Sequence, residues 1–454
     1  MASDLTSTTV DAPRATVASS PLPGALLKTA WGAVILLGLI VLAGSSARTL
    51  FAPIQEAAKQ DLGLSDFQLS MVQGIAAAIP VALVSIPLGW LADHSSRIRI
   101  LIGLALCWTI GTVMTAFVDG FGWLFFARML AGLGGTCVVP VAISVAADLC
   151  LPDQRGRSML FLAIGNVAGG AVAFGVGGAL FGVFSGDVAL PIVHLSAWRE
   201  VHLAFGLASV VLILPLLFMR EPARHEVEKV GAAIGPTVRA LWARRAFLLP
   251  LFVGQVGVTM ADASAAIWAA PVLSRDFGLQ PAQFAGWMGG VILLAGIFGA
   301  VLGGFSADWG HKRKRRGGIL IGAVIAAAIG VPTALFPIMP TVPAFGIMLL
   351  ILLLSGTVTG LITATAIAVL VPNEERGLCL GAFMILGSIV GLGVSPILVT
   401  LGSQALGGEN ALGMGLAAVG VVVGLLSLGG FVLAMLNAPV REPSELALPV
   451  VAAH

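Results

Sequence analysis

Three charged side chains lie within long apolar stretches of the sequence: Arg48, Arg128 and Asp262. Ionisable residues in such surroundings are costly, so they usually mark binding sites or ion pathways. An arginine there can hold a carboxylate or phosphate by paired hydrogen bonds. An aspartate there can accept a proton or form a fixed ion pair with an arginine. We therefore predict that Arg48 binds an anion, and that Asp262 is either a proton acceptor or the static partner of Arg48.

Polar residues at helical spacing accompany these charges. They form three stripes: Ser45 with Arg48; Gln255, Thr259 and Asp262; and Ser355, Thr359 and Thr363. Residues three or four positions apart lie on one face of a helix. We expect the stripes to converge on one substrate site, with Ser45, Arg48, Gln255, Thr259, Asp262, Thr359 and Thr363 as binding residues. The alternative is that the hydroxyls only bond to carbonyls of their own helices.

The composition predicts helices that cross a membrane. The chain has 454 residues, of which 58% are apolar and 10% charged, and its mean hydropathy is +1.03. Soluble domains carry about 25% charged residues, so this chain has too few to cover a surface in water. Apolar stretches long enough to cross about 30 Å of hydrocarbon recur throughout. We expect twelve spans: 31–52, 67–91, 100–118, 121–148, 158–183, 200–219, 247–272, 283–306, 317–337, 343–371, 378–402 and 412–436.

The sequence repeats itself at an offset of 215 residues. Asp61, Gly63, Leu64, Gln68, Gly89, Ala92 and Asp93 recur as Asp276, Gly278, Leu279, Gln283, Gly304, Ala307 and Asp308. A repeat held at one offset without a gap predicts two homologous halves. We therefore divide the chain into a tail (1–28), an N-terminal six-helix bundle (29–220), a linker (221–245), a C-terminal six-helix bundle (246–437) and a second tail (438–454).

The distribution of basic residues sets the expected orientation. With the N-terminus in the cytoplasm, nineteen of the 24 Lys and Arg residues fall on the cytoplasmic side. Cytoplasmic loops of membrane proteins carry this excess of positive charge. We expect the linker, both tails and both termini to lie in the cytoplasm.

Two related segments follow the second and eighth spans: GWLADHSSRIR from Gly89 and GFSADWGHKRKRR from Gly304. A glycine near a helix end lets two helices approach closely. An aspartate there can accept from free N–H groups at the start of a neighbouring helix. Arg97 can pair with a second acid, for which Asp148 is the candidate. The alternative is that the charged residues only hold the loops at the lipid headgroups.

The first of these segments resembles the loop motif G-x-L-A-D-[RK]-x-G-R-[RK] of the major facilitator superfamily. Gly89, Leu91, Ala92, Asp93 and Arg97 match, whereas His94 and Ser96 differ. Three further segments resemble signatures of that family: RMLAGLG (128–134), DLCLPDQRGR (148–157) and PNEERG (372–377). The resemblance implies an all-α membrane protein of twelve helices in two pseudo-symmetric six-helix bundles, which work by alternating access around a site near the membrane midplane. It also implies a cytoplasmic latch that joins the bundles in the outward-facing state, made of Gly89, Asp93, Arg97, Asp148, Gly304 and Asp308.

Within that superfamily, DLGLSDFQLSMVQG (61–74) and the segment 198–224 are most similar to the spinster-like branch. The branch commonly has an acid before the span-one arginine and another after G-x-G in span four, and these acids are its usual candidates for proton coupling. Here Ala47 and Gly135 stand in those places. Asp262 and Arg128, the counterpart of the family's span-four arginine, are then the proton-coupling candidates. The alternative for Arg128 is an anchor at the membrane interface.

Together these features predict a secondary transporter, not an enzyme. We expect it to move a small organic anion or a lysolipid-like amphiphile across the plasma (inner) membrane, driven by the proton gradient. The alternatives are a facilitative carrier and a transport-inactive receptor. We expect a monomer in the lipid bilayer, with protons as a further partner. No cofactor, metal site or nucleic-acid partner is predicted, because no metal-ligand spacing and no phosphate-binding loop occur.

Overall fold

The computed structural model describes residues 29–186, 194–224, 234–312 and 315–439. The tail expected at 1–28, all but the first two residues of the tail expected at 438–454, and part of the expected linker (225–233) lie outside the described residues. Within the described ranges, twelve helices are long and apolar enough to cross a membrane. The prediction of an all-α membrane protein with twelve spans is therefore confirmed.

The N-terminal half contains six spans. Its helices are α1 (Trp31–Thr49), α2 (Gln55–Leu62), α3 (Asp66–Ser70), α4 (Ala76–His94), α5 (Arg97–Thr115), α6 (Phe121–Leu149), α7 (Arg155–Ser185) and α8 (Ala197–Leu217). Short 3-10 turns occupy Ala52–Ile54 and Pro152–Gln154, and a π-helical turn at Met71–Ile75 joins α3 to α4. The first span is thus broken between α1 and α2, where Pro53 has no N–H to donate to a continuing helix.

The C-terminal half repeats this plan. Its helices are α9 (Ile234–Ala243), α10 (Arg245–Asp276), α11 (Pro281–Lys312), α12 (Ile321–Thr333), α13 (Val342–Leu370), α14 (Asn373–Leu386), α15 (Ser395–Leu406) and α16 (Leu412–Asn437). A π-helical segment at Gly387–Val394 joins α14 to α15, and 3-10 turns occupy Gly318–Leu320, Phe336–Ile338 and Glu409–Ala411. The helix α9 is the only element described within the expected linker, and it lies beside α14 and α10.

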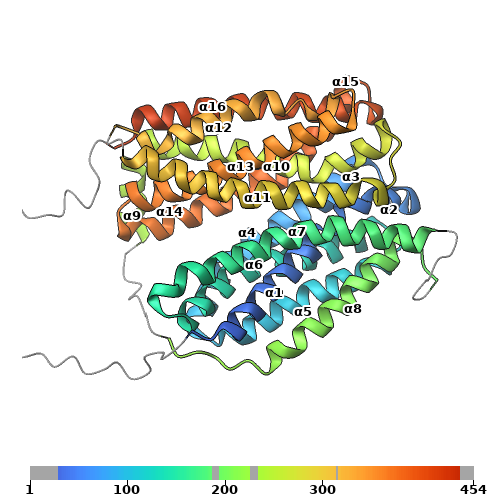
Figure 1. The fold of residues 1–454 in the computed structure, drawn as a ribbon, viewed down its shortest axis with the longest axis horizontal. Coiled ribbons are helices and arrows are strands. Elements are labelled where there is room, and N and C mark those ends of the chain that lie inside the picture. The colour runs from blue at the N-terminus through green and yellow to red at the C-terminus, as the bar shows by residue number, and fades with distance from the viewer. Residues whose placement is uncertain (1–28, 187–193, 225–233, 313–314, 440–454) are drawn as a thin grey trace, which may run out of the picture.

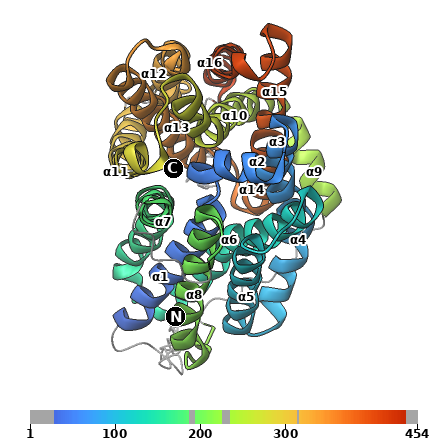
Figure 2. The ribbon, with the colours of Figure 1, turned by 90° about the vertical axis from the view of Figure 1, so that its right-hand side faces the viewer.

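The two halves lie side by side as elongated bundles, the N-terminal one below and the C-terminal one above in Figure 1. We call the end of the molecule that carries Asp93, Asp148, Asp308 and Glu375 the motif end; in Figure 1 it is at the left, with α9 and α14. The opposite end, which carries Lys59, Asp66, Arg275 and Glu409, is called the sealed end. Figure 2 views the molecule from the sealed end, where α2 and α3 of the first half lie against the second half.

The residues of the internal repeat build the same turn in both halves. Gly63 and Gly278 both have a left-handed backbone, with φ of 63° and 66°. That conformation ends a helix and favours glycine. Gln68 and Gln283 each accept, through the side-chain oxygen, a hydrogen bond from the backbone N–H three residues earlier (3.0 and 2.8 Å). The repeated residues therefore stop one helix and start the next.

The apolar core is continuous between the bundles at the sealed end and divided at the motif end. One cluster of buried residues contains members of both halves, among them Phe51, Trp268 and Phe284. Toward the motif end each bundle has a separate cluster, one including Trp108 and the other including Phe431. Since core packing joins the bundles at one end, the molecule is held closed there and divided at the other.

Candidate functional site

A cavity of about 600 Å³ lies between the two bundles. Most of its lining is apolar, and its polar side chains come from both halves: Ser45, Arg48, Thr49, Gln73, Arg128, Thr136, Asn166, Thr259, Asp262, Thr357 and Ser388. Among these lining residues, Asp262 is the one carboxylate. An apolar cavity with a few converging polar groups is the usual form of a small-molecule site.

Arg48 lies in the last turn of α1 and lines this cavity. In the described part of the chain, no side chain or carbonyl forms a hydrogen bond or ion pair with its guanidinium. A guanidinium has five donors in a fixed fork that matches a carboxylate, sulfonate or phosphate. Arg48 is therefore free to bind an anion that enters the cavity.

Arg128 has a different environment. It is 4% exposed, and its Nη1 donates to the carbonyl of Ala47 at 3.2 Å while its Nη2 donates to the carbonyl of Arg48. Its guanidinium also lies 5.5 Å from the ring centroid of Phe51. These contacts satisfy carbonyls at the C-terminus of α1, which otherwise lack partners. The interpretation of Arg128 as an interfacial anchor is wrong, because the side chain is buried between α6 and α1.

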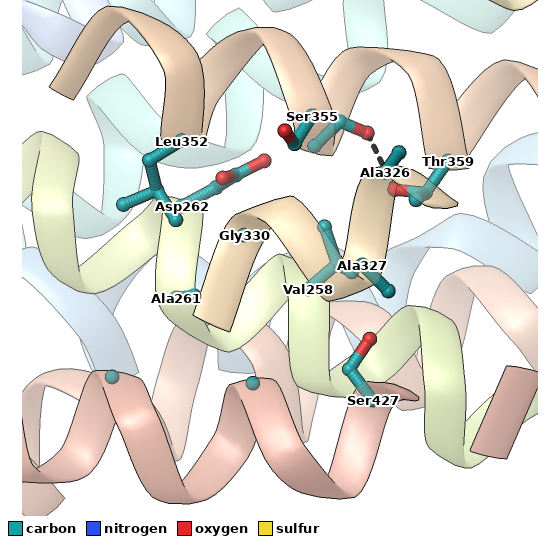
Figure 3. A pocket seen from close by; sticks show the side chains of 13 residues that line it. Val258, Ala261, Asp262, Ala326, Ala327, Gly330, Leu352, Ser355, Thr359 and Ser427 are labelled. Atoms are coloured by element: carbon teal, nitrogen blue, oxygen red, sulfur yellow. Dashed lines mark hydrogen bonds between the residues drawn. The ribbon is translucent and has the colours of Figure 1, made fainter. Parts of the chain in front are cut away.

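Asp262 lines the central cavity and also a much smaller pocket inside the C-terminal bundle. The small pocket has a volume of about 20 Å³ and lies among α10, α12, α13 and α16. Figure 3 shows the Asp262 carboxylate and the Ser355 hydroxyl pointing toward each other, with Ser427 pointing in from α16. The Oδ1 atom of Asp262 and the hydroxyl of Ser427 are buried without a hydrogen-bond partner. A space of this size holds about one water molecule.

The ion pair considered between Arg48 and Asp262 is not formed in this structure, although both residues line one cavity. The carboxylate of Asp262 lies instead against Gly356 on α13, so closely that a Cβ at that position would collide with it. An ionised carboxylate without a partner in such a place would be very costly. Among the described residues, the Asp262 carboxylate has no ionic partner in this conformation, and its Oδ1 is buried without a hydrogen bond.

The polar stripes are only partly where we expected them. Ser45 and Thr259 line the central cavity. Gln255 and Thr363 are buried between α10 and α13, where the threonine hydroxyl donates to the glutamine oxygen at 3.0 Å. Thr359 faces the small pocket and donates to the carbonyl of Gly356 at 2.9 Å. The expected convergence of Gln255, Thr359 and Thr363 on the central cavity is thus absent here.

Several polar residues of the cavity were missed by the sequence analysis: Gln73, Thr136, Asn166, Thr357 and Ser388. On α13 the residues that line the cavity are Leu349, Leu353 and Thr357. This row is two positions away from the Ser355 stripe, which contacts the neighbouring helices of its own bundle. Gln73 and Asn166 are amides within apolar spans, and that signal alone could have identified them.

Charged residues join the bundles at the sealed end. Arg275 of α10 binds both oxygens of Asp66 at 2.7 Å and both oxygens of Glu56 at 3.1 and 2.9 Å. Lys59 contacts Asp66 at 2.8 Å and Glu409 of the second half at 2.5 Å. Asp66 is 3% exposed. Bidentate arginine–carboxylate pairs are the strongest ion pairs in proteins, so this cluster reinforces the closure made by the apolar core.

The ion pairs at the motif end remain within one bundle. Arg97 contacts Asp148 at 2.5 Å, as its position suggested, and Glu221 at 2.8 Å. Arg224 donates to the carbonyls of Ala92 and Ser95, both at 2.8 Å. These contacts tie the end of α8 to the loop between α4 and α5.

The residues expected to connect the bundles at this end are separated. The side chains of Asp93 and Asp308 are exposed, and no described residue bonds to either. A Cβ at Gly89 would meet nothing within 4 Å, and one at Gly304 would meet only a Leu361 carbon of its own bundle at 3.9 Å. The close helix contact expected at these two glycines is therefore not made, because the bundles diverge here.

Glu221 is held in its charged form by this arrangement. Burial alone would raise the pKa of its carboxyl group. Hydrogen bonds from the backbone N–H of Ile98 (3.0 Å), from Arg97 (2.8 Å) and from Ser96 (2.8 Å) outweigh that effect. The pKa of Glu221 consequently lies below its usual value. Donors that bind the charged form of a carboxylate lower its pKa in this way.

The position of Gly135 explains why no acid stands there. The glycine packs against α1, and a Cβ would collide with the carbonyl oxygen of Gly44. A glutamate at 135 would push α6 away from α1. This close packing leaves Asp262 as the carboxylate of the cavity.

Comparisons with known proteins agree with this architecture. The family model described as "Major Facilitator Superfamily" matches residues 35–396. The fold is similar to that of a solved bacterial homolog of the human lysosomal transporter Spinster, with a TM-score of 0.75. That structure is in an inward-facing and unoccupied conformation. The identity is 22%, and the match covers 90% of this chain and 96% of that one.

Three curated relatives share parts of the sequence. A probable sulfoacetate transporter of Cupriavidus necator is 27% identical over 59% of this chain and 62% of its own length. Protein spinster homolog 1 of Xenopus tropicalis is 25% identical over 60% of this chain, and a 3-(3-hydroxy-phenyl)propionate transporter of Escherichia coli is 30% identical over 50%. The matched part of the chain spans about half the length of the last two, 53% of each.

Proposed function

The chain belongs to the major facilitator superfamily, close to its spinster branch, and on that premise we propose that it carries a small organic anion by alternating access. As a member of this family it is an integral membrane transporter and not an enzyme. The proposal rests chiefly on one observation: Arg48 lines a cavity between the two bundles and has no partner for its guanidinium among the described residues. Two of the relatives are transporters named for organic anions, sulfoacetate and a phenylpropionate.

The substrate class follows from the lining of the cavity. Arg48 supplies a bidentate site for a carboxylate or sulfonate. The apolar walls around it, which include Phe174, Met288 and Leu349, suit a short hydrocarbon or aromatic body. A lysolipid-like amphiphile also combines an anionic group with an apolar body, and it is the larger candidate of the same chemistry.

We assign the conformation as open toward the cytoplasm. Core packing, together with the ion cluster of Arg275 and Asp66, closes the sealed end, whereas the bundles diverge at the motif end. Most Lys and Arg residues fall at the motif end, and by the positive-inside rule this supports a cytoplasmic location for that end. The membrane that we propose is the plasma (inner) membrane. Gly89, Asp93, Arg97, Asp148, Gly304 and Asp308 would then form the latch of the opposite, outward-facing state.

For energy coupling we propose that Asp262 exchanges a proton. It is the one carboxylate of the described cavity lining, and its Oδ1 has no hydrogen-bond partner. Binding of a proton to Asp262 of one bundle and of an anion to Arg48 of the other would neutralise both buried charges in one step. Arg128 has its donors on carbonyls of α1, so we propose that it positions Arg48 and does not itself carry the proton.

A facilitative carrier is the second candidate, and a specific observation supports it. The two acids that the spinster-like branch commonly has are replaced by Ala47 and Gly135, and the packing at Gly135 excludes an acid. Flux that is independent of pH, and unchanged in Asp262→Asn, would select this candidate.

Purified protein should be screened by thermal shift against short carboxylates, sulfonates, aryl-propionates and lysolipids. We expect at least one anion to raise the melting temperature, and Arg48→Ala to lose that shift. Arg48→Lys should keep part of it, because the charge remains while the bidentate fork is lost. Arg99→Gln, which removes an exposed arginine outside the cavity, is the matched control. An unchanged anion response in Arg48→Ala would reject the proposed site.

A further inference from the structure

The helix α9 has two different faces and lies outside the central cavity. It occupies Ile234–Ala243 at the motif end, directly before α10, and lies beside α14. Its inner face carries Leu241, which packs against the core of the C-terminal bundle. Arg244, just after the helix, forms an ion pair with Glu375 of α14 at 3.2 Å. These contacts fix α9 to the C-terminal bundle.

The outer face of α9 combines apolar and basic side chains. Val238 is 50% exposed and Trp242 is 61% exposed. Arg239 is exposed and has no partner among the described residues. Arg245 lies with its guanidinium 5.8 Å from the centroid of the Trp242 ring and donates to the Trp242 carbonyl at 3.3 Å. We call Val238, Arg239 and Trp242, together with Arg245 at the start of α10, the outer face of α9.

The position of this face determines what can cover it. The next helix, α10, is one of the twelve spans, and its Leu249 and Val253 are about half exposed (48% and 51%). These residues lie in the first turns of the span, and Val238 and Trp242 precede that span directly in the chain. Arg245 is the first residue of that span, a position that corresponds to the headgroup level, and Arg239 lies on the helix directly before it. Figure 2 shows α9 at the outer edge of the molecule.

We infer that the outer face of α9 binds an anionic phospholipid of the leaflet at the motif end. Arg239 and Arg245 contact the phosphate and the anionic headgroup, and Trp242 lies at the boundary between headgroups and acyl chains. Tryptophan is enriched at that boundary, and basic residues beside a span attract anionic lipids. The lipid contact does not depend on the carried substrate; only its assignment to the cytoplasmic leaflet rests on the orientation proposed above.

A lipid at this place would act on the conformational change. The helix α9 is tied to Glu375, near the start of α14, and thus to the part of the C-terminal bundle that must move when the motif end closes. An anionic headgroup bound to α9 holds that part at the membrane surface. Binding would therefore keep the C-terminal bundle at a fixed depth while the two bundles rock.

The test uses the full chain reconstituted in phosphatidylcholine vesicles that contain a brominated lipid, which quenches tryptophan fluorescence on contact. The brominated lipid is either phosphatidylglycerol or phosphatidylcholine at the same mole fraction. Because the chain has nine tryptophans, the spectrum of Trp242→Phe is subtracted to isolate Trp242. We expect Trp242 to be quenched by both lipids, with an apparent affinity about tenfold higher for the anionic one.

The variant Arg239→Gln/Arg245→Gln should lose this preference while Trp242 stays quenched. Raised salt should reduce the preference in the wild-type protein, because salt screens exposed charges. The matched control is Arg99→Gln/Arg157→Gln, which removes two exposed arginines at the same end of the other bundle and should leave the preference unchanged. Equal quenching by both lipids in the wild type would overturn the headgroup contact. Absence of quenching by either would show that protein, not lipid, covers α9.

Discussion

Because Gly356 has no side chain, the carboxylate of Asp262 can lie against it. The two residues are on adjacent helices, and the carboxylate occupies the space that a side chain at 356 would need. The same α13 helix presents Thr357 to the central cavity and Ser355 to the small pocket. One turn of α13 therefore touches both spaces that Asp262 lines.

Gly356→Ala should displace the carboxylate of Asp262. We expect a loss of stability of about 1–3 kcal/mol, the usual cost of an added methyl group in a packed core. If Asp262 exchanges the proton, the pH dependence of transport should also change. Melting temperature and pH-dependent flux in proteoliposomes are the measurements.

The control for this substitution is Gly360→Ala, one turn further along α13. A Cβ at 360 would lie 3.7 Å from the nearest described atom, Nε2 of Gln255, which is an ordinary contact. Gly360→Ala should therefore be close to neutral or slightly stabilising in a helix. Equal melting temperatures for the two variants would contradict the packing of Asp262 against Gly356.

The residues of the candidate site were only partly predictable. Arg48 and Asp262 stand out because charges inside apolar spans are rare, and both line the cavity. On α13 the prediction chose the wrong face of the helix. Thr357 lines the central cavity, whereas Ser355 and Thr359 face the small pocket. Spacing shows which residues share a face, but the rotation of a helix in its bundle depends on packing against neighbours that the sequence does not position.

At the scale of elements, charged side chains of the C-terminal bundle hold the sealed end by contacting α2 and α3 of the N-terminal bundle. Arg275, near the end of α10, contacts Glu56 of α2 and Asp66 of α3. Arg199, at the start of α8, forms a similar pair with Asp61 at 3.1 Å, but both members of that pair belong to the N-terminal bundle. The first pair joins the bundles and the second does not.

Arg275→Ala should open the sealed end. The cost should lie below the roughly 3–5 kcal/mol of a fully buried pair, because Glu56 loses its arginine while Asp66 keeps Lys59 at 2.8 Å. The closed arrangement alone bears that cost, so the population should shift toward the state open at this end. Spin labels at Gln60 and Gln404 would report the change as a longer distance in double electron–electron resonance.

Arg199→Ala is the matched control for this experiment. It removes an arginine at the same end, but its ion pair lies within one bundle and moves with it. The distance between the two labels should remain that of the wild type. A shift of the same size in both variants would mean that the sealed end responds to lost charge in general and not to the cross-bundle contact.

The stability that the loop between α4 and α5 gains from its contacts with Glu221 should depend on pH. Its pKa is lowered in the folded protein, so the group stabilises the fold above its unfolded pKa, which is about 4.3. That contribution is lost as the pH falls through the lower, folded pKa. The wild type should therefore melt at a higher temperature than Glu221→Gln at neutral pH, and the two should converge in acid. A constant difference at all pH values would contradict this.

On the scale of the whole molecule, the two ends differ in whether the bundles are in contact. The apolar core and an ion cluster join the bundles at the sealed end. At the motif end Gly89, Asp93, Gly304 and Asp308 make no contact between the bundles among the described residues. An alternating-access carrier must exchange these states, so contacts at one end form when those at the other break. Residues of the latch should then affect transport more than they affect the stability of the present conformation.

Asp93→Asn tests this expectation. The side chain has no partner among the described residues and is exposed, so the free energy of unfolding should change by no more than about 0.5 kcal/mol, and the melting temperature should change little. The transport rate should fall several-fold, because the outward-facing state loses a contact. Arg97→Ala should behave differently and lower the melting temperature, since Arg97 pairs with Asp148 and Glu221 in this state. Full transport by Asp93→Asn would remove it from the latch.

Most of the overall architecture could be predicted from the sequence. The apolar spans are long and separated by charged loops, so their number is clear, and the repeat at Gly63 and Gly278 is produced by a turn that only a few residues can form. The conformation could not be predicted, because the same residues must serve both states of a carrier. Asp93 illustrates this: its side chain is exposed in this conformation, and the contact that we propose for it belongs to the opposite state.

The turn at Gly63 and Gly278 has a consequence for how such carriers diversify. The two halves have kept the same glycine and glutamine at that turn, whereas Arg48 corresponds, at the same offset, to Ala263 in the other half. After the duplication, the residues of the turn stayed the same in both halves, whereas the position of Arg48 came to differ between them. A carrier built on this duplicated plan can change its cargo by changing a few inward-facing positions, because the turns that connect its spans do not depend on those positions.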